Sequence, residues 1–129
     1  MTRQLNPEQI AAPVGPYSQG VLVSGTGTWL HIAGQVGMHK DGSLAQGMAE
    51  QADLAWSNLN EVLRAAGLEV ADLVKVVTYV TDETQLAALG PVRLKYLGDA
   101  RPASTLVVVK ALARPEWLFE VEAVAFKAA

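Results

Sequence analysis

The chain has 129 residues, of which 50% are hydrophobic and 18% charged, with a net charge of −3 and no cysteine. The lack of cysteine excludes disulfides and thiolate chemistry and fits a reducing compartment. Without a Lys- or Arg-rich run, nucleic acid is not expected as a partner, and no apolar stretch is long enough to span a membrane. We therefore expect a cytoplasmic protein with one domain over residues 1–129.

The charged fraction is informative about assembly. Soluble domains carry about 25% charged residues, and a small monomer has a large surface relative to its volume. The value of 18% therefore predicts that part of the surface is buried against other copies of the chain in a homo-oligomer.

Two strands are predicted in the first third of the chain. Gly20–Val23 and Trp29–Val36 are rich in apolar residues, and the turn-like run Ser24–Gly27 separates them. Asp41-Gly42 then marks a turn.

A long helix follows. Apolar residues recur at alternating spacings of 4 and 3, which is the period of one helical face. They are Met48, Ala52, Ala55, Leu59, Val62 and Ala66. Gly67 is expected to end the helix, because the residue after a helix often takes the left-handed conformation.

The next segment predicts a strand and a second helix. Asp72–Val80 is rich in valine and contains a tyrosine, which favours a strand. Glu83–Leu89 reads as a loose turn, and Pro91–Leu97 as a helix that begins with proline and is closed by Gly98.

Two strands complete the chain, Ser104–Leu112 and Leu118–Phe126, with residues 113–116 as a predicted hairpin connection. This order predicts an α+β fold, a mixed sheet with both helices on one face. The other face then needs covering by neighbouring copies. The residues expected on that face are Val107, Val109, Phe119 and Val121.

Short segments along the whole chain resemble the Rid family (reactive intermediate deaminases, also called YjgF). They are residues 12–19 (APVGPYSQ), 33–35 (AGQ), Gln51, 58–59, 65–67, 72–75, 101–103 (RPA) and 120–123 (EVEA). Each is short, but they are collinear and together cover nearly the whole chain.

The resemblance implies a homotrimer of chorismate-mutase-like subunits, with small-molecule ligands bound in clefts between subunits. Family members hydrolyse reactive enamines and imines to 2-oxo acids and ammonia, without a cofactor or metal. An arginine holds the substrate carboxylate, and a glutamate helps to position the attacking water.

One departure concerns the arginine. After Pro102-Ala103 this chain has Ser104 where the family has arginine. Serine cannot replace a charged, two-pronged donor. Either the substrate has no carboxylate at this place, or another cation binds it. The two candidate cations are Arg93, where the family usually has tyrosine, and Arg101; the alternative for Arg93 is an ordinary surface arginine.

The other candidate site residues follow from the same resemblance. Glu120 matches the catalytic glutamate, and burial on a strand would raise its pKa; alternatively it makes a subunit contact. Tyr17 matches a tyrosine that lines the cleft, although its ring can simply pack. Gly34 is expected either to let the ligand approach the backbone or to form a bulge. Thr105 is expected to present its backbone amide, and Glu122 is read as structural.

Three functions remain open at this level. The first is hydrolysis of imines or enamines with an altered substrate, and the second is a non-catalytic binding or regulatory homotrimer. The third, RNA cleavage, is disfavoured by the negative charge. Neither His31 nor His39 has partners at metal-ligand spacing, so no metal site is expected.

Overall fold

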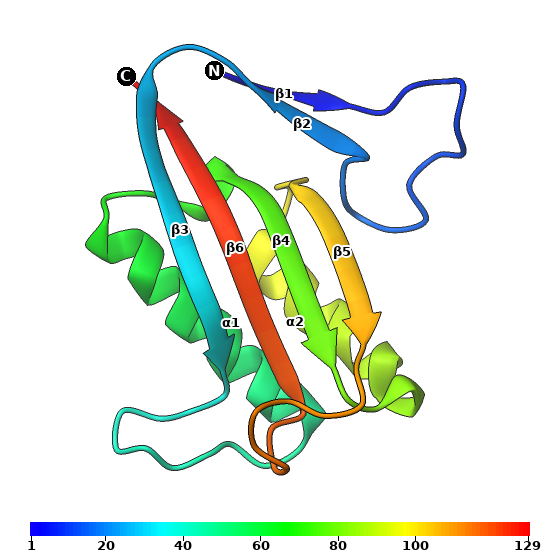
Figure 1. Ribbon diagram of the computed structural model, residues 1–129, viewed down its shortest axis with the longest axis vertical. Coiled ribbons are helices and arrows are strands. Elements are labelled where there is room, and N and C mark those ends of the chain that lie inside the picture. Colours follow the sequence, from blue (N-terminus) through cyan, green and yellow to red (C-terminus); the bar gives the residue numbers. More distant parts are fainter.

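A four-stranded mixed sheet forms the centre of the molecule (Figure 1). The computed structural model describes all residues from Met1 to Ala129. The strands lie in the order β3 (Gly27–Val36), β6 (Phe119–Ala128), β4 (Leu73–Val80) and β5 (Ala103–Val108). β6 pairs antiparallel with both β3 and β4, whereas β4 and β5 are parallel.

Both helices pack on one face of this sheet, behind it in Figure 1, which confirms the predicted α+β class. They are α1 (Met48–Ala65) and α2 (Leu89–Leu97). Two short 3-10 turns, Val70–Asp72 and Glu83–Ala88, precede β4 and α2. Neither helix combines the length and the apolar character that a membrane crossing requires.

The predicted apolar stripe explains how α1 attaches to the sheet. Its buried residues include Met48, Ala52, Ala55 and Leu59, which join the core under β3, β4 and β6. Ala66, the last residue of the predicted stripe, is exposed. Gly67 follows with φ 73° and ends the helix as expected.

A separate two-stranded sheet carries the N-terminus, with β1 (Thr2–Leu5) paired to β2 (Gly20–Val23). β2 was predicted from the sequence, whereas β1 was not. Ser18 ties the segment before β2 to the start of β5. Its amide donates to the Pro102 carbonyl at 3.1 Å, and its hydroxyl donates to the Arg101 carbonyl at 2.5 Å.

The prediction for the helix-free face was wrong at two positions. Phe119 is 1% exposed and Val121 is 0% exposed, and both belong to the core under the helices. Residues alternate between the two faces along a strand, so Glu120 and Glu122 lie on the other face instead. We call this helix-free side the open face. Val107 lies there and is 38% exposed, as expected.

The predicted hairpin between the last two strands was also wrong. β5 and β6 are not neighbours, because β4 lies between them. The segment from β4 through α2 to β5 is a crossover connection, which places β5 parallel and next to β4. β5 ends at Val108 rather than Leu112, and residues 109–118 carry the chain past β4 to β6.

Candidate functional site

Glu120 lies on the open face of β6 directly beside Gly34. The β3–β6 ladder is irregular between Ile32 and Gln35, so Gly34 falls in a bulge. A Cβ atom built on Gly34 would overlap a carboxylate oxygen of Glu120 and would come within 2.7 Å of its carboxyl carbon. Only a residue without a side chain therefore leaves room for Glu120 in this position.

Two further polar side chains adjoin Glu120. Tyr79 pairs with Glu120 across β4 and β6, and its hydroxyl donates a short hydrogen bond to the Glu122 carboxylate. Burial, and then the charge of Glu122, raise the pKa of Glu120. The hydrogen bond to Glu122 in turn raises the pKa of Tyr79. We call Gly34, Tyr79, Glu120 and Glu122 the carboxylate site.

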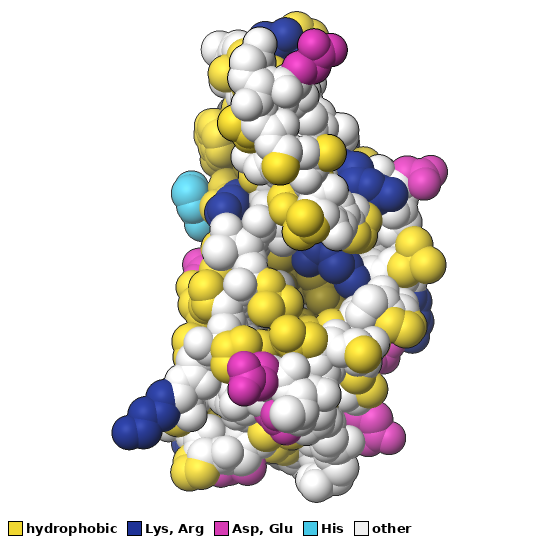
Figure 2. All heavy atoms as spheres, turned by 90° about the vertical axis from the view of Figure 1, so that its right-hand side faces the viewer, with side chains coloured by type: hydrophobic (Ala, Val, Ile, Leu, Met, Phe, Trp, Pro, Cys, Tyr) yellow, Lys and Arg dark blue, Asp and Glu magenta, His cyan; other side chains and the backbone are white.

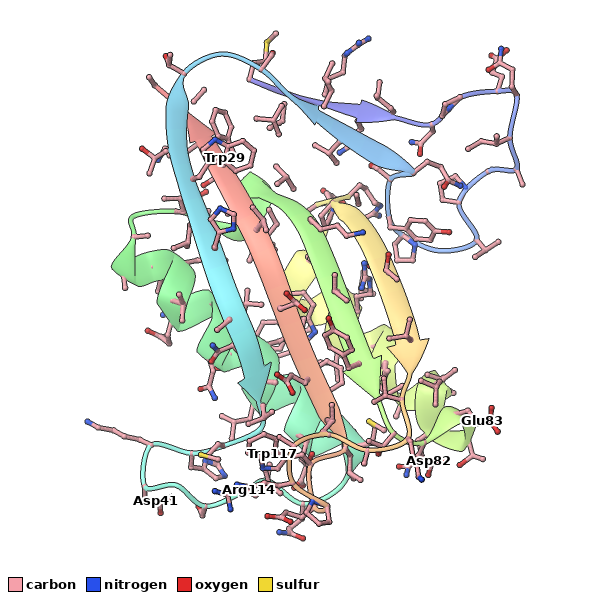
Figure 3. All side chains as sticks on the ribbon, viewed as in Figure 1. Trp29, Asp41, Asp82, Glu83, Arg114 and Trp117 are labelled. Atoms are coloured by element: carbon pink, nitrogen blue, oxygen red, sulfur yellow. The ribbon has the colours of Figure 1, made fainter.

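The carboxylate site opens onto a groove. The groove has a volume of about 360 Å³ and is bounded by the connection that follows β5, residues 109–113. Further along the same connection, Arg114 lies 5.9 Å from the ring centre of Trp117, at the bottom of Figure 3. A small molecule entering the groove would meet two acidic side chains and the phenol of Tyr79.

A second candidate site, a small cavity that contains an arginine, lies on the helix side of the sheet. Arg93 projects from α2 into a cavity of about 30 Å³, whose other lining residues are Ala52, Trp56, Thr78, Leu89, Val92, Leu106 and Phe119. The Nη2 atom of Arg93 is buried and has no hydrogen-bond partner. Burial, and then the charge of Arg101, lower the pKa of Arg93. We call Arg93 and this cavity the arginine pocket.

The arginine pocket lies at the β5 edge of the molecule. Figure 2 looks at this edge and shows a hollow with hydrophobic walls and basic side chains at its upper margin. Ser104 pairs with the core residue Val76, so it faces the helices on the same side as Leu106, which lines the pocket. Thr105 faces the open side, where its hydroxyl accepts a hydrogen bond from Lys75 Nζ at 3.0 Å.

Tyr17 and Arg101 lie near the start of β5. The Tyr17 hydroxyl accepts a long hydrogen bond, 3.4 Å, from the amide of Val14, so the ring folds back onto its own loop. The Arg101 guanidinium donates to the carbonyls of Gly98 and Ala100 at 2.8 and 2.9 Å. Arg101 therefore holds the end of α2, whereas Arg93 has no such partner.

Four of the predicted site residues thus fall into two groups, apart from Tyr17 and Thr105. Gly34 and Glu120 are together on the open face, while Arg93 and Ser104 are on the helix side near the β5 edge. Sequence reasoning missed Tyr79, and it read Glu122 as structural. Strand alternation was the available signal for Tyr79, because it places this tyrosine on the open face with Lys75 and Val77.

No three His, Cys, Asp or Glu side chains are arranged to hold a metal ion. His31 instead stacks beside Trp29 with a ring separation of 6.5 Å.

Known proteins share this architecture over almost the whole chain. The family model described as Endoribonuclease L-PSP matches residues 8–127. The crystal structure of YyfB from Yersinia pestis, a protein of the conserved Rid family, superimposes with a TM-score of 0.85 at 39% identity, covering 98% of each chain. A RutC family protein of Pyrococcus horikoshii is 34% identical over 93% of this chain and 94% of its own.

A relative with a named activity is also similar. The human protein 2-iminobutanoate/2-iminopropanoate deaminase is 33% identical over 97% of this chain and 90% of its own length. The fold, with two helices on one face of a mixed sheet, is that of the Rid and YjgF structures. The chain belongs to the Rid (YjgF) family, as the resemblance of its short motifs predicted.

Proposed function

We propose that this protein hydrolyses reactive enamine and imine intermediates, with release of ammonia, in clefts between the copies of a homotrimer. The observation that carries this proposal is the Glu120 carboxyl, which stands over Gly34 with a raised pKa at the edge of a groove. The 2-iminobutanoate/2-iminopropanoate deaminases among its relatives support the reaction class.

Glu120 is the proposed catalytic carboxyl. As a carboxylate it accepts a proton from water while the water oxygen bonds to the carbon of the protonated imine, and the C=N electron pair moves to nitrogen to give a neutral carbinolamine. As a carboxylic acid it then gives this proton to the amino nitrogen. The C–N bond breaks with release of ammonia, and the hydroxyl proton passes back to the Glu120 carboxylate as the C=O bond forms and is then lost to solvent. A raised pKa suits this exchange, because general acid–base catalysis is most efficient when the pKa lies near the working pH.

The positions of the two groups support a site shared between copies. Within one copy, Glu120 is on the open face and Arg93 is on the helix side of the sheet, so one small ligand cannot touch both. A neighbouring copy would bring its carboxylate site to the β5 edge. β5 is an edge strand whose outer side has no strand partner beyond the bridge between Ser18 and Ala103, and it carries the exposed side chains of Leu106, Val107 and Val108, which favours burial against another chain.

Trp29, at the upper end of β3 in Figure 3, is a further exposed apolar side chain, 50% exposed, at the other edge of the sheet. Light scattering on a size-exclusion column tests the assembly. A homotrimer has about three times the mass of one 13.7 kDa chain. A monomer at micromolar concentration would contradict the shared cleft.

The substrate is proposed to differ from the family's usual one in how it is held. Tyr17, Gly34, Arg93, Ser104 and Thr105 are the proposed contacts. Ser104 offers only a neutral hydroxyl, so a carboxylate of the substrate would have to be bound by a positively charged residue other than the one at position 104. RNA is not proposed as a substrate, because the net charge of −3 gives no electrostatic attraction for phosphates.

The reaction is tested by generating an imine in place. A threonine dehydratase supplies 2-iminobutanoate, and the release of ammonia is timed with and without the protein. Wild type is expected to accelerate release, and Glu120→Gln to abolish the acceleration while keeping the shape of the side chain. Glu61→Gln, at an exposed position on α1, removes the same charge and serves as the control.

If the wild-type trimer gave no acceleration over buffer, hydrolysis would be excluded for this substrate. The non-catalytic binding trimer would then be the better description.

A further inference from the structure

Arg93 is the only residue with a buried side-chain nitrogen or oxygen that lacks a hydrogen-bond partner. Buried polar groups in proteins are almost always paired, and an unpaired buried charge is especially unfavourable. The exception in this molecule therefore requires a physical explanation.

No acidic residue of the chain supplies the missing partner. The two ion pairs of the structure join Arg64 to Glu61 and Lys95 to Asp53. Arg101 is the charged group that acts on Arg93, and it is also positive. The surroundings of Arg93 are otherwise apolar, apart from Thr78. The pocket thus has the positive charge of an anion site without an anion from its own chain.

The size and walls of the pocket limit what the anion can be. The cavity of about 30 Å³ has room for about two water molecules, or a planar group of similar size. A guanidinium group binds a carboxylate through its planar fork. A carboxylate fills a cavity of this size, so a short alkyl group attached to it would lie against Leu106, which lines the pocket and is 42% exposed. A phosphate ester or a nucleotide would be too large.

We propose that the arginine pocket binds the carboxylate of a short-chain 2-imino acid, with Arg93 as the anion-binding residue. The identity of the ligand rests on the proposed function, whereas binding itself needs no turnover. Ser104 lies on the same side of β5 as Leu106 and two residues before it, which is about 7 Å along a strand. An arginine introduced at position 104 is long enough to reach the same pocket.

Binding is measured with 2-oxobutanoate, the stable carbonyl product of 2-iminobutanoate, by isothermal titration calorimetry. Arg93→Met is expected to weaken binding roughly 10- to 100-fold, because it removes a charged hydrogen bond. Lys95→Met removes the same charge from the same helix at an exposed position, so binding is expected to be unchanged. The uncharged analogue 2-butanone is expected to bind weakly and equally to wild type and Arg93→Met.

Two further variants separate anion binding from a structural role. In buffer without carboxylates, Arg93→Met is expected to unfold at a higher temperature than wild type, because methionine removes a partly buried charge whose Nη2 atom has no partner. The double variant Arg93→Met/Ser104→Arg is expected to regain 2-oxobutanoate binding, since its new guanidinium enters the same pocket.

Several results would overturn the inference. One is unchanged 2-oxobutanoate binding by Arg93→Met. Another is a combined result, in which wild type binds no carboxylate and Arg93→Met no longer forms the oligomer. In that case the partner of Arg93 would be an acidic residue of a neighbouring copy.

The inference and the proposed function can fail separately. Arg93-dependent binding without imine hydrolysis would support the anion site and contradict the proposed enzyme. Imine hydrolysis with a KM that is insensitive to Arg93→Met would support the enzyme and contradict the anion site.

Discussion

Gly34→Ala should damage the carboxylate site while leaving the fold intact. The new Cβ would lie 2.7 Å from the carboxyl carbon of Glu120, against 3.4 Å for ordinary contact, and would overlap one carboxylate oxygen outright. That oxygen must therefore withdraw by roughly 1 Å or more, and a displacement of this size can reduce a catalysed rate about 100-fold. We expect kcat/KM for imine hydrolysis to fall by about that factor.

The stability of Gly34→Ala should change little. The clash involves the end of a flexible side chain, which can rotate away at a cost of about 0.5 to 1.5 kcal/mol. Gly34 does not have a positive φ, so alanine also reduces the freedom of the unfolded chain, which stabilises by about 0.4 to 1 kcal/mol. The net change in the free energy of unfolding should thus stay within about 1 kcal/mol.

Gly37→Ala is the matched control. Its Cβ would lie 2.5 Å from the Cα of Gln51 and 2.7 Å from the Gln51 carbonyl oxygen, so the backbone of α1 must move. Overpacking of this kind typically costs about 1 to 3 kcal/mol. Urea unfolding at one fixed protein concentration compares the two variants. Gly34→Ala with full activity, or with as large a stability loss as Gly37→Ala, would refute this account of Glu120.

Three other changes test neighbouring features. Glu120→Gln should become more stable relative to wild type as the pH rises. Because the folded-state pKa of Glu120 is raised, its contribution to stability is complete below its ordinary pKa and is lost as the pH rises through the folded value. Parallel curves of melting temperature against pH for the two proteins would contradict this. Tyr79→Phe removes the hydrogen bond to Glu122 and leaves that charge less compensated. Because the charge of Glu122 raises the pKa of Glu120, this pKa should rise further, and the acid limb of the pH–rate profile should move to higher pH. An unchanged acid limb would argue against coupling of the two carboxyls. Gln51→Leu leaves the amide of Leu118 and the carbonyl of Glu116 without their partner. Two unpaired, partly buried groups should cost roughly 2 to 4 kcal/mol in urea unfolding, and a loss below 1 kcal/mol would mean that water replaces the glutamine.

Local patterns account for the features that the sequence predicted well. The apolar stripe of α1 and the closing Gly67 depend on neighbours three and four residues apart, so both were visible in the chain. The second helix is likewise closed by Gly98 as predicted, although it begins at Leu89 and not at Pro91. Collinear short motifs identified the family, and with it Gly34 and Glu120 as candidate site residues.

Pairing between distant segments decided the rest. The sequence shows that residues alternate along β6, but only packing against α1 shows that Phe119 and Val121 face the core while Glu120 and Glu122 do not. The insertion of β4 between β5 and β6 is likewise invisible to local patterns.

What the chain determined by itself is therefore most of its helices and strands, its fold class and its family. The tertiary structure alone decided that Gly34 makes room for Glu120, that Tyr79 bonds to Glu122, and that the Nη2 atom of Arg93 is buried without a partner. The physical reason is that burial and contact depend on which surfaces meet, and these surfaces come from segments tens of residues apart.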